Sequence, residues 1–360
     1  MRVMTIFGTR PEMIKLWSTM RKLDALGYEH IMVHTGQNFS KELKDFFYRD
    51  LGLRPADYEL NIDTSSYGRE VADVISKSDD LMAKLKPDAL LILGDTFSGL
   101  SVMPAVQRGI KVYHMEAGLR AWDVRMPEQR NRILIDHMSH INLPFQSYHR
   151  DNLLREGIHP SRIFVTGNTT FEVMREFRPQ IDASDILGRL GLEPDGYVLA
   201  TAHRSEAVDV PEHMGNILRA LGAIAERTRR KVLFSVHPRT QGRLMGFEIP
   251  ANVQVVPPVG FFDFNKLLIE CHCFVSDSGT APEESLFYRK PCVTLRMAME
   301  RPETIEAAGT IVSGLEPENV VESVLQAVAL PYCGRYEFED GFEPSTVVLN
   351  VMRSRITNFF

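Results

Sequence analysis

The sequence is built from short, unbroken apolar runs, each of which ends in polar residues before a helix-like segment. The clearest run is ALLIL at 89–93, which ends at Gly94. Similar runs cover Val3 to Phe7, Ile31 to Val33 and Val112 to Met115. A strand that is apolar at every position is buried on both faces, as in a parallel sheet covered by helices. The pattern therefore predicts an α/β fold.

Segments with helical periodicity lie between these runs. Apolar residues from Met13 to Leu26 recur at helical spacing, and Lys41 to Leu51 is a second amphipathic segment. Pro11 suits the first turn of a helix, where the missing N–H has no partner to lose.

The same alternation restarts after about residue 170. Further strands are predicted at Tyr197–Thr201, Lys231–Val236, Val253–Val256 and Cys273–Val275, with helices at Pro211–Arg227 and Phe264–Cys271. Two doubly wound parallel-sheet domains are therefore expected, with their boundary near Asn168 to Arg178.

The charge balance excludes some classes of function. The chain has 360 residues, with 41 Lys and Arg against 47 Asp and Glu, a net charge of −6. Binders of nucleic acid or of membrane surfaces carry a basic excess. The apolar run at the amino terminus is too short for the apolar part of a signal peptide. No run of about 18 apolar residues is present in the sequence. We expect a cytoplasmic protein that binds neither nucleic acid nor membranes.

The cysteines do not follow a zinc pattern. Cys271 and Cys273 flank His272, but no CxxC pair or suitable His spacing accompanies them. We interpret this run as a short buried strand and expect no metal site.

Three carboxylates of the first half are candidates for acid–base chemistry. Asp95 and Glu116 follow apolar runs, and Glu128 lies in an arginine-rich segment. One carboxylate at a strand end is often a helix cap or the partner of an arginine. Three of them, without a metal-ligand cluster, favour general acid–base work on a neutral substrate. Arg132 lies one helical turn past Glu128, where we expect it to orient or neutralise that carboxylate, although a solvated ion pair would give the same pattern.

The strand ends of the second half carry groups suited to an anionic ligand. His203 with Arg204, and His237 in HPRT, follow predicted strands. Ser278 and Gly279 precede a helix-like segment whose free N–H groups would suit a phosphate, although Ser-Gly is also a common helix-capping pattern. Ligands of doubly wound sheets bind beyond the carboxyl ends of the strands, so two facing domains would place all these groups around one cleft.

A series of motifs runs through nearly the whole chain in a fixed order. They are GTRPE at 8–12 with Lys15, LGDT at 93–96, HMEAGLR at 114–120, PEQRNR at 127–132, TGN at 166–168, AHR at 202–204, SDSG at 276–279, EES at 283–285 and ERPET at 300–304. Together they resemble the motifs of the non-hydrolysing UDP-N-acetylglucosamine 2-epimerases.

The resemblance implies the GT-B architecture, which consists of two Rossmann-like domains with an interdomain cleft. Residues 1–170 would form the first domain, 171–344 a UDP-binding domain, and 345–360 a helix that packs back on the first. It also implies a homodimer and a reaction without a cofactor, in agreement with the absence of a GxGxxG motif.

The reaction implied by the resemblance is inversion at C2 of a UDP-linked 2-acetamido sugar. UDP is eliminated in the anti sense to give a 2-acetamidoglucal, and UDP then adds back with the opposite configuration at C2. UDP-N-acetylglucosamine and UDP-N-acetylmannosamine would interconvert, which would feed surface polysaccharide synthesis.

The resemblance also assigns residues to roles, and which carboxylate takes the C2 proton stays open. Asp95, Glu116 and Glu128 match the acid–base carboxylates, and we count His203 among the catalytic groups although it matches a nucleotide-holding position. The other expected binding residues are Arg10, Lys15, Arg132, Arg204, His237, Phe264, Ser278, Gly279, Glu284 and Arg301. Phe264 matches a phenylalanine beside uracil.

Some positions depart from the common pattern. Asn38 follows Gly36-Gln37 where allosterically regulated members have histidine, and Thr280 follows Ser278-Gly279 in place of a second glycine. These features are similar to a capsule and O-antigen branch that interconverts UDP-2-acetamido-2,6-dideoxy-L-talose and UDP-N-acetyl-L-fucosamine. Either sugar fits the motifs.

Two other classes compete with an epimerase. A GT-B glycosyltransferase shares the architecture and the UDP site, but the three carboxylates at epimerase spacing disfavour it. A relative that only binds UDP-sugars would be expected to have lost one of those carboxylates, and all three are present.

Overall fold

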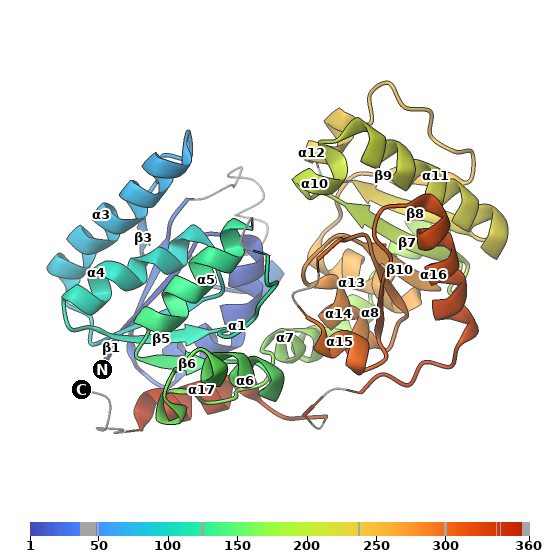
Figure 1. Cartoon of the computed structure of the whole chain (residues 1–360). Helices are drawn as coiled ribbons and strands as arrows, with labels where there is room; N and C mark the ends of the chain where they lie inside the picture. Colours follow the sequence, from blue (N-terminus) through green and yellow to red (C-terminus); the bar gives the residue numbers. More distant parts are fainter. Residues whose placement is uncertain are drawn as a thin grey trace. The chain divides into compact units, whose positions relative to one another are not determined.

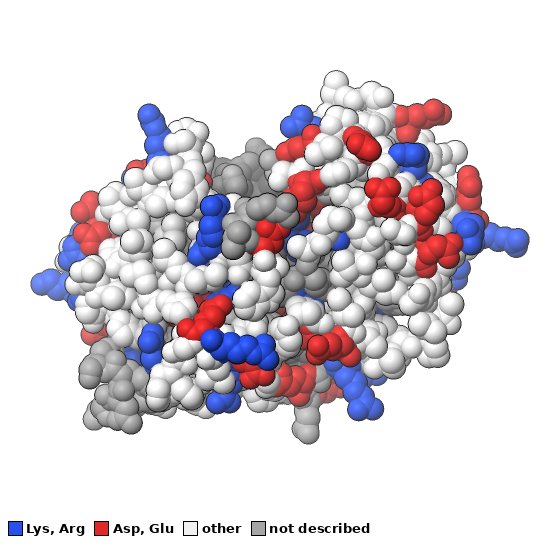
Figure 2. Space-filling view, in the orientation of Figure 1, with Lys and Arg blue, Asp and Glu red and all other residues white. Residues whose placement is uncertain are grey.

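A computed structural model describes residues 1–36, 48, 50–123, 126–236, 238–298, 301–335, 337–338 and 340–354 (Figure 1). The chain divides into two compact units. The first consists of Met1–Glu176 and Glu337–Phe360, and the second of Phe177–Tyr336. Acidic and basic side chains are interspersed on the face shown in Figure 2.

The first unit is a six-stranded parallel sheet in the order β3-β2-β1-β4-β5-β6. Its strands are β1 (Arg2–Phe7), β2 (Glu29–His34), β3 (Tyr58–Glu59), β4 (Ala89–Leu93), β5 (Lys111–Met115) and β6 (Ile141–Leu143). All five residues of β4 are buried, because helices cover both faces of the sheet.

The helices of the first unit fill the connections between strands. They are α1 (Arg10–Ala25), α3 (Tyr67–Leu85), η1 (Phe97–Ser101), α4 (Val102–Gln107), α5 (Pro127–Met138), α6 (Ser147–Arg155), η2 (Pro160–Arg162), α7 (Thr170–Glu176) and α17 (Pro344–Arg353). Helix α1 begins three residues before the expected Met13, because Pro11 suits its first turn and Glu12 accepts the Thr9 N–H there. The expected helix at 41–51 lies largely outside the described residues.

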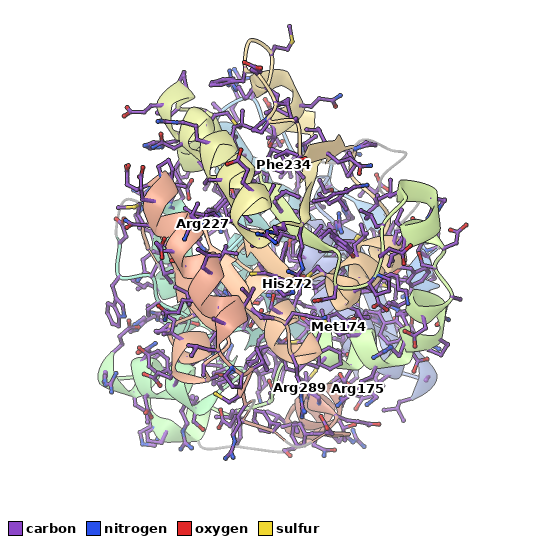
Figure 3. The ribbon with its side chains drawn as sticks, turned by 90° about the vertical axis from the view of Figure 1, so that its right-hand side faces the viewer. Met174, Arg175, Arg227, Phe234, His272 and Arg289 are labelled. Carbon is purple, nitrogen blue, oxygen red and sulfur yellow. The ribbon has the colours of Figure 1, made fainter. Side chains whose placement is uncertain are left out.

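The second unit repeats this topology, with the order β12-β11-β10-β7-β8-β9. Its strands are β7 (Tyr197–Ala202), β8 (Lys231–Val236), β9 (Val253–Val256), β10 (Cys273–Ser276), β11 (Cys292–Thr294) and β12 (Thr310–Val312). Phe234 of β8 is fully buried in its core (Figure 3). In both units the first and fourth strands of the unit are neighbours at the centre, which is the Rossmann strand order. The expected doubly wound parallel architecture is confirmed.

The helices of the second unit are α8 (Arg178–Asp182), α9 (Ile186–Leu190), α10 (Ser205–Val208), α11 (Pro211–Thr228), α12 (Pro238–Arg243), α13 (Phe261–Glu270), α14 (Ala281–Tyr288), α15 (Glu303–Glu306) and α16 (Pro317–Ala329). Helix α13 starts three residues before the expected Phe264. Phe261 is buried there and packs edge-on against Phe177, so this first turn is part of the core.

The boundary between the units lies between Glu176 and Phe177, within the expected range of 168–178 and past the expected division at residue 170. Helix α7 belongs to the first unit because Glu172 accepts hydrogen bonds from the Ser18 hydroxyl of α1 at 2.6 Å and from the Ser345 N–H at 3.1 Å. Arg175, also on α7 (Figure 3), donates to the carbonyl of Phe342. These contacts place α7 and the carboxy-terminal segment from Glu337 onward with α1.

No helix in the described ranges combines the length and apolar character needed to cross a bilayer.

Strand order reverses between β1 and β4 in the first unit, and between β7 and β10 in the second. At such a point the connections leave in opposite directions, so the carboxyl ends of the strands form a crevice where ligands bind in this class of fold. The residues after β1, β4, β5, β7 and β10 are therefore the ones to examine for chemistry.

Replacing Gly118 tests the close packing just after β5. Gly118 has φ +81°, and a Cβ there would overlap the carbonyl of His149. Because the backbone must shift, Gly118→Ala should lower the free energy of unfolding by about 2–4 kcal/mol in urea denaturation. Gly157→Ala is the control, since Gly157 has φ +86° with no atom within 4 Å of an added Cβ. It should cost only about 1–2 kcal/mol, and equal losses would contradict the steric argument.

Candidate active site

Two carboxylates lie side by side at the carboxyl edge of the first sheet. Asp95 follows β4 by one residue and Glu116 directly follows β5, and these strands pair in parallel as far as Leu93 and Met115. The side chain of Asp95 is 18% exposed and that of Glu116 only 6%. Both carboxylates thus lie at strand ends, as the sequence predicts.

Arg132 of α5 joins the two carboxylates. Its Nη2 lies 3.1 Å from Glu116 Oε1 and also pairs with Asp95 Oδ2, and its Nη1 donates to the Glu116 carbonyl at 2.5 Å. Lys15 of α1 pairs with the other oxygen of Glu116. A buried charge needs a partner of opposite sign to offset its loss of hydration. Here two cations compensate two largely desolvated anions.

The expected pairing of Arg132 with Glu128 is wrong. The guanidinium of Arg132 forms its ion pairs with Asp95 and Glu116, because α5 packs against η1 and α4 and its Arg132 meets those carboxylates. Glu128 lies in the first turn of α5, half-buried, and makes no hydrogen bond or ion pair to a described residue. The positive end of the helix dipole favours a carboxylate at that position.

Glu116 has an uncommon backbone conformation, with φ at +60°. A left-handed conformation costs a residue with a Cβ about 1–2 kcal/mol and persists where the surroundings enforce it, often at functional sites. The neighbouring Gly94 has φ +74°, and an added Cβ there would be in ordinary van der Waals contact with Glu116 Oε1 at 3.5 Å.

A second buried network, which was not predicted from the sequence, lies next to the segment that carries Glu116. Asp136 of α5 is fully buried, lies 2.8 Å from His114 Nδ1 and accepts from the Gly118 N–H at 3.2 Å. Arg120 Nη2 lies 2.8 Å from the other side of the Asp136 carboxylate, and Arg120 also forms a two-point ion pair with Glu156. The His114 contact is off the axis of a directed hydrogen bond and is mainly electrostatic.

This network fixes the segment that carries Glu116. His114 Nε2 contacts the Gly94 carbonyl at 2.8 Å, next to Asp95. Burial acts to raise the pKa of Asp136, but the contact with His114 and the charges of Arg120 and Arg132 outweigh it, so the pKa lies below its usual value. The only sequence signal was the placement of His114 and Arg120 within the HMEAGLR motif.

Arg10 and Lys15 both belong to the start of α1, which follows β1. Arg10 is half-buried at the first position of the helix, and Lys15 Nζ lies 5.7 Å from the centre of the Phe145 ring. Of the residues predicted in the first unit, the structure brings Lys15, Asp95, Glu116 and Arg132 into direct contact.

In the second unit, Asp277 after β10 fixes the segment after β7. Its Oδ2 accepts from the backbone N–H groups of His203 and Arg204, each at 2.8 Å, and His203 Nδ1 lies 3.2 Å from Oδ1. Burial opposes ionisation of Asp277, but His203 and the two N–H groups outweigh it and lower the pKa. The His203 side chain stays 42% exposed.

The turn after β10 leads into α14. Ser278 hydrogen-bonds to Ser276 through its N–H at 3.0 Å, and its hydroxyl lies 3.2 Å from the Thr280 hydroxyl. Thr280 makes no side-chain cap to α14. Gly279 lies within this turn, so Ser278 and Gly279 are next to the free N–H groups of an eight-residue helix.

The other predicted residues of the second unit that the structure describes are buried or half-buried among neighbouring side chains. Arg301 is buried, with its Nε 3.0 Å from Oε1 of the equally buried Glu283. Phe264 is half-buried and packs edge-on against Phe274 of β10. Glu284 is half-buried in the first turn of α14. His237 lies outside the described residues, as do Asn38 and Glu300.

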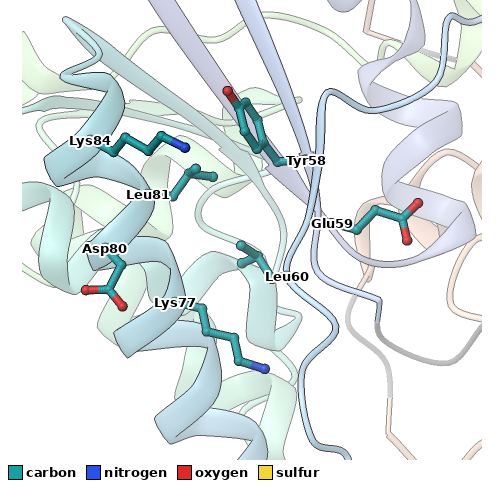
Figure 4. Close-up of a pocket in the computed structure, with 7 residues that line it drawn as sticks. All are labelled: Tyr58, Glu59, Leu60, Lys77, Asp80, Leu81 and Lys84. Carbon is teal, nitrogen blue, oxygen red and sulfur yellow. The ribbon is translucent and has the colours of Figure 1, made fainter.

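An open surface pocket of about 300 Å³ lies elsewhere, between β3 and α3 (Figure 4). Its lining consists of Tyr58, Glu59, Leu60, Lys77, Asp80, Leu81 and Lys84. None of these is a predicted site residue. In the described part of the chain, no three His, Cys, Asp or Glu side chains are grouped as metal ligands would be.

Removing the charge of Asp136 tests the supporting network. Asp136→Asn should lower the free energy of unfolding at pH 7 by about 3–5 kcal/mol, because Arg120 and His114 lose a buried anion. The folded pKa lies below the ordinary 3.8, so the stability from ionised Asp136 is present above that value and is lost as the pH falls through the lower folded pKa. Urea denaturation should show the difference between wild type and variant shrinking below pH 4. A difference independent of pH would contradict the electrostatic account.

Comparisons with known proteins agree with the motifs. A family model described as UDP-N-acetylglucosamine 2-epimerase matches residues 21–338. A UDP-N-acetylglucosamine 2-epimerase of Methanocaldococcus jannaschii is 34% identical over 335 residues, covering 90% of this chain and 91% of that protein. A UDP-2,3-diacetamido-2,3-dideoxy-D-glucuronate 2-epimerase of Pseudomonas aeruginosa is 33% identical over 329 residues, with 90% and 91% covered.

The fold agrees as well. The crystal structure of the M. jannaschii UDP-GlcNAc 2-epimerase in complex with UDP-GlcNAc and UDP superposes with a TM-score of 0.91 and 31% identity, covering 98% of this chain and 100% of that one. The family expected from the motifs is confirmed, and with it the GT-B-like pair of Rossmann-like units. The chain therefore belongs to the UDP-N-acetylglucosamine 2-epimerases, a family of isomerases.

Proposed function

We propose that this protein inverts C2 of a UDP-linked 2-acetamido sugar and interconverts UDP-N-acetylglucosamine and UDP-N-acetylmannosamine. The observation that carries the proposal is the cluster of Asp95 and Glu116 around Arg132, with Glu128 at the start of the same helix. Carboxylates at the carboxyl edge of a doubly wound sheet are placed to act on a bound ligand.

The proposed chemistry needs no redox partner. A base removes the proton at C2, the C2 electron pair forms the C1=C2 double bond, and the C1–O bond to UDP breaks with its electron pair on the departing UDP. UDP then adds back to C1 of the 2-acetamidoglucal, and C2 receives a proton on its opposite face. Atoms and charge balance in each direction.

Two of the three carboxylates are suited to carry the C2 proton. Glu128 lies half-buried in the first turn of α5 and has no cation partner among the described residues. Asp95 shares Arg132 but keeps more exposure than Glu116. We assign the two faces of C2 to Glu128 and Asp95. Glu116, held by two cations, orients Arg132 and Lys15.

The departing UDP requires positive charge and hydrogen-bond donors where its negative charge develops. We assign the nucleotide and its phosphates to His203, Arg204, Ser278 and Gly279 of the second unit, with Phe264 beside the base. The anchoring of His203 and Arg204 by Asp277 supports this assignment, since it holds their backbone in one geometry. Arg10 and Lys15 supply charge from the first unit, and His237, Glu284 and Arg301 complete the proposed set.

The sugar itself is a separate question. Relatives of similar identity are named for different substrates, UDP-N-acetylglucosamine in one case and a UDP-diacetamido-glucuronate in another. The motifs of this chain also resemble those of the branch that acts on UDP-2-acetamido-2,6-dideoxy-L-talose. The same groups and steps serve either sugar, so the test includes both.

Proton NMR in D2O tests the function directly. With UDP-N-acetylglucosamine, the H2 signal should disappear while UDP-N-acetylmannosamine appears, because the proton removed from C2 is replaced from solvent. Exchange only with the 6-deoxy-L sugar would assign that substrate instead. Failure of exchange and epimerisation with both sugars would contradict the proposal and favour a glycosyltransferase.

Single-atom changes in the carboxylates test their roles. Asp95→Asn and Glu128→Gln should each lower kcat by about 10²- to 10⁴-fold while UDP affinity, measured by calorimetry, is retained. Glu212→Gln is the matched control, since Glu212 follows a proline in the first turn of α11 as Glu128 does in α5. Arg10→Ala should instead weaken UDP binding. Turnover at the wild-type rate in either carboxylate variant would remove that residue from the mechanism.

A further inference from the structure

Glu12 is buried in the first turn of α1 and accepts hydrogen bonds from two separate turns. Its Oε2 accepts from the Gly8 N–H at 3.1 Å, the Thr9 N–H at 2.9 Å and the Thr9 hydroxyl at 2.8 Å. Its Oε1 accepts from the Thr96 hydroxyl at 3.0 Å and from the Ser98 hydroxyl. The residue is 1% exposed.

These turns follow β1 and β4, the neighbouring strands at which the order of the sheet reverses. Thr9 directly precedes Arg10, and Thr96 directly follows Asp95. One carboxylate therefore connects the turn that carries a proposed nucleotide-binding arginine with the turn that carries a proposed acid–base group.

Helix capping explains only half of this arrangement. A capping box requires one carboxylate oxygen to accept the N–H of the cap residue, here Thr9, and Oε2 does so. Helix α3 begins with Ser66 accepting from the Arg69 N–H and has no comparable bridge to another strand end. The contacts of Oε1 with Thr96 and Ser98 thus go beyond what the start of α1 needs.

The charge of Glu12 does not serve stability. Glu12 forms no ion pair with a described residue, and burial raises its pKa despite the hydroxyl and N–H donors around it. A carboxyl whose pKa is raised on folding stabilises the fold when protonated, and that contribution is lost as the pH rises through the folded pKa. At neutral pH a neutral amide of the same shape would suit the fold as well or better. Buried titratable groups whose charged form the fold disfavours are concentrated at functional sites.

We propose that Glu12 is a positioning residue, which holds the Asp95 and Arg10 turns in the geometry that the reaction requires without itself touching the substrate. The inference rests on the proposed function. It also accounts for Thr9, Thr96 and Ser98, polar residues near strand ends for which the proposed chemistry has no direct use.

Two shape-conserving variants test the bridge. In Glu12→Gln the amide oxygen can replace Oε2, but an amide nitrogen in place of Oε1 cannot accept from the Thr96 and Ser98 hydroxyls, so these contacts and the charge are removed with little change in shape. Thr96→Val instead removes one contact of Oε1. Each should lower kcat on the order of 10- to 100-fold with KM and UDP affinity nearly unchanged. The thermal midpoint of Glu12→Gln at pH 7 should equal or exceed that of wild type.

The double variant gives the sharper result. If Glu12 and Thr96 act through one contact, the loss of kcat in Glu12→Gln/Thr96→Val should be well below the product of the two single losses. Independent, multiplicative losses would overturn the proposal, and so would kcat within about twofold of wild type in both single variants.

Ser66→Ala is the control for a purely structural effect. It removes the cap of α3 and should lower stability by about 1 kcal/mol while leaving kcat unchanged. An equal loss of kcat in Ser66→Ala would overturn the proposal, because the loss would then reflect general loosening. Wild-type turnover is measured first: its absence with both sugars contradicts the proposed function, whereas turnover that the Glu12 and Thr96 variants leave intact contradicts only the role of Glu12.

Discussion

The ion pairs of Arg132 with Asp95 and Glu116 join helix α5 to the segments that follow β4 and β5. Two carboxylates at the ends of adjacent strands would repel each other and lose their hydration on burial, a cost of several kcal/mol for each uncompensated ion. Arg132 from α5 and Lys15 from α1 supply the opposing charges. Both helices are therefore held against the edge of the sheet that carries the carboxylates, and Asp136 fixes α5 from the other side.

For the proposed reaction, this arrangement would provide a preorganised environment. Glu116 is held at φ +60° by contacts on both oxygens and on its carbonyl. Side chains fixed in this way need little reorganisation when charge develops on a ligand, which is the main source of electrostatic catalysis. Glu128, the other proposed proton carrier, is half-buried at the start of α5 without a cation partner among the described residues.

The sequence alone identified most strands of both sheets but not β3, β6, β11 and β12. The run 89–93 is apolar throughout, and a strand buried on both faces leaves that pattern in the sequence. Helix starts were less accessible: α1 and α13 begin three residues early because a capping glutamate and a packed phenylalanine extend them. The position of α7 depends on the contact of Glu172 with Ser18, which links residues far apart in the chain.

Some contacts among the candidate site residues could be predicted from the sequence and others could not. Parallel strand ends bring Asp95 and Glu116 together, so their proximity followed from the pattern. The carboxylates that pair with Arg132 did not follow from the pattern. Helical spacing identifies Glu128 as a neighbour, whereas the packing of α5 against η1 and α4 decides which carboxylates the guanidinium meets. Asp136 and Glu12 were missed for the same reason: their roles consist of contacts with backbone and hydroxyl groups that no spacing encodes.

The central claim is that the C1–O bond to UDP breaks during inversion at C2. The most direct measurement uses substrate labelled with 18O at the oxygen that bridges C1 and the β-phosphate, and follows the label by phosphorus NMR. The account predicts that the label moves to non-bridging β-phosphate positions while C2 exchanges with solvent. Retention of all the label in the bridge during C2 inversion would contradict it, because the proton would then leave and return without departure of UDP.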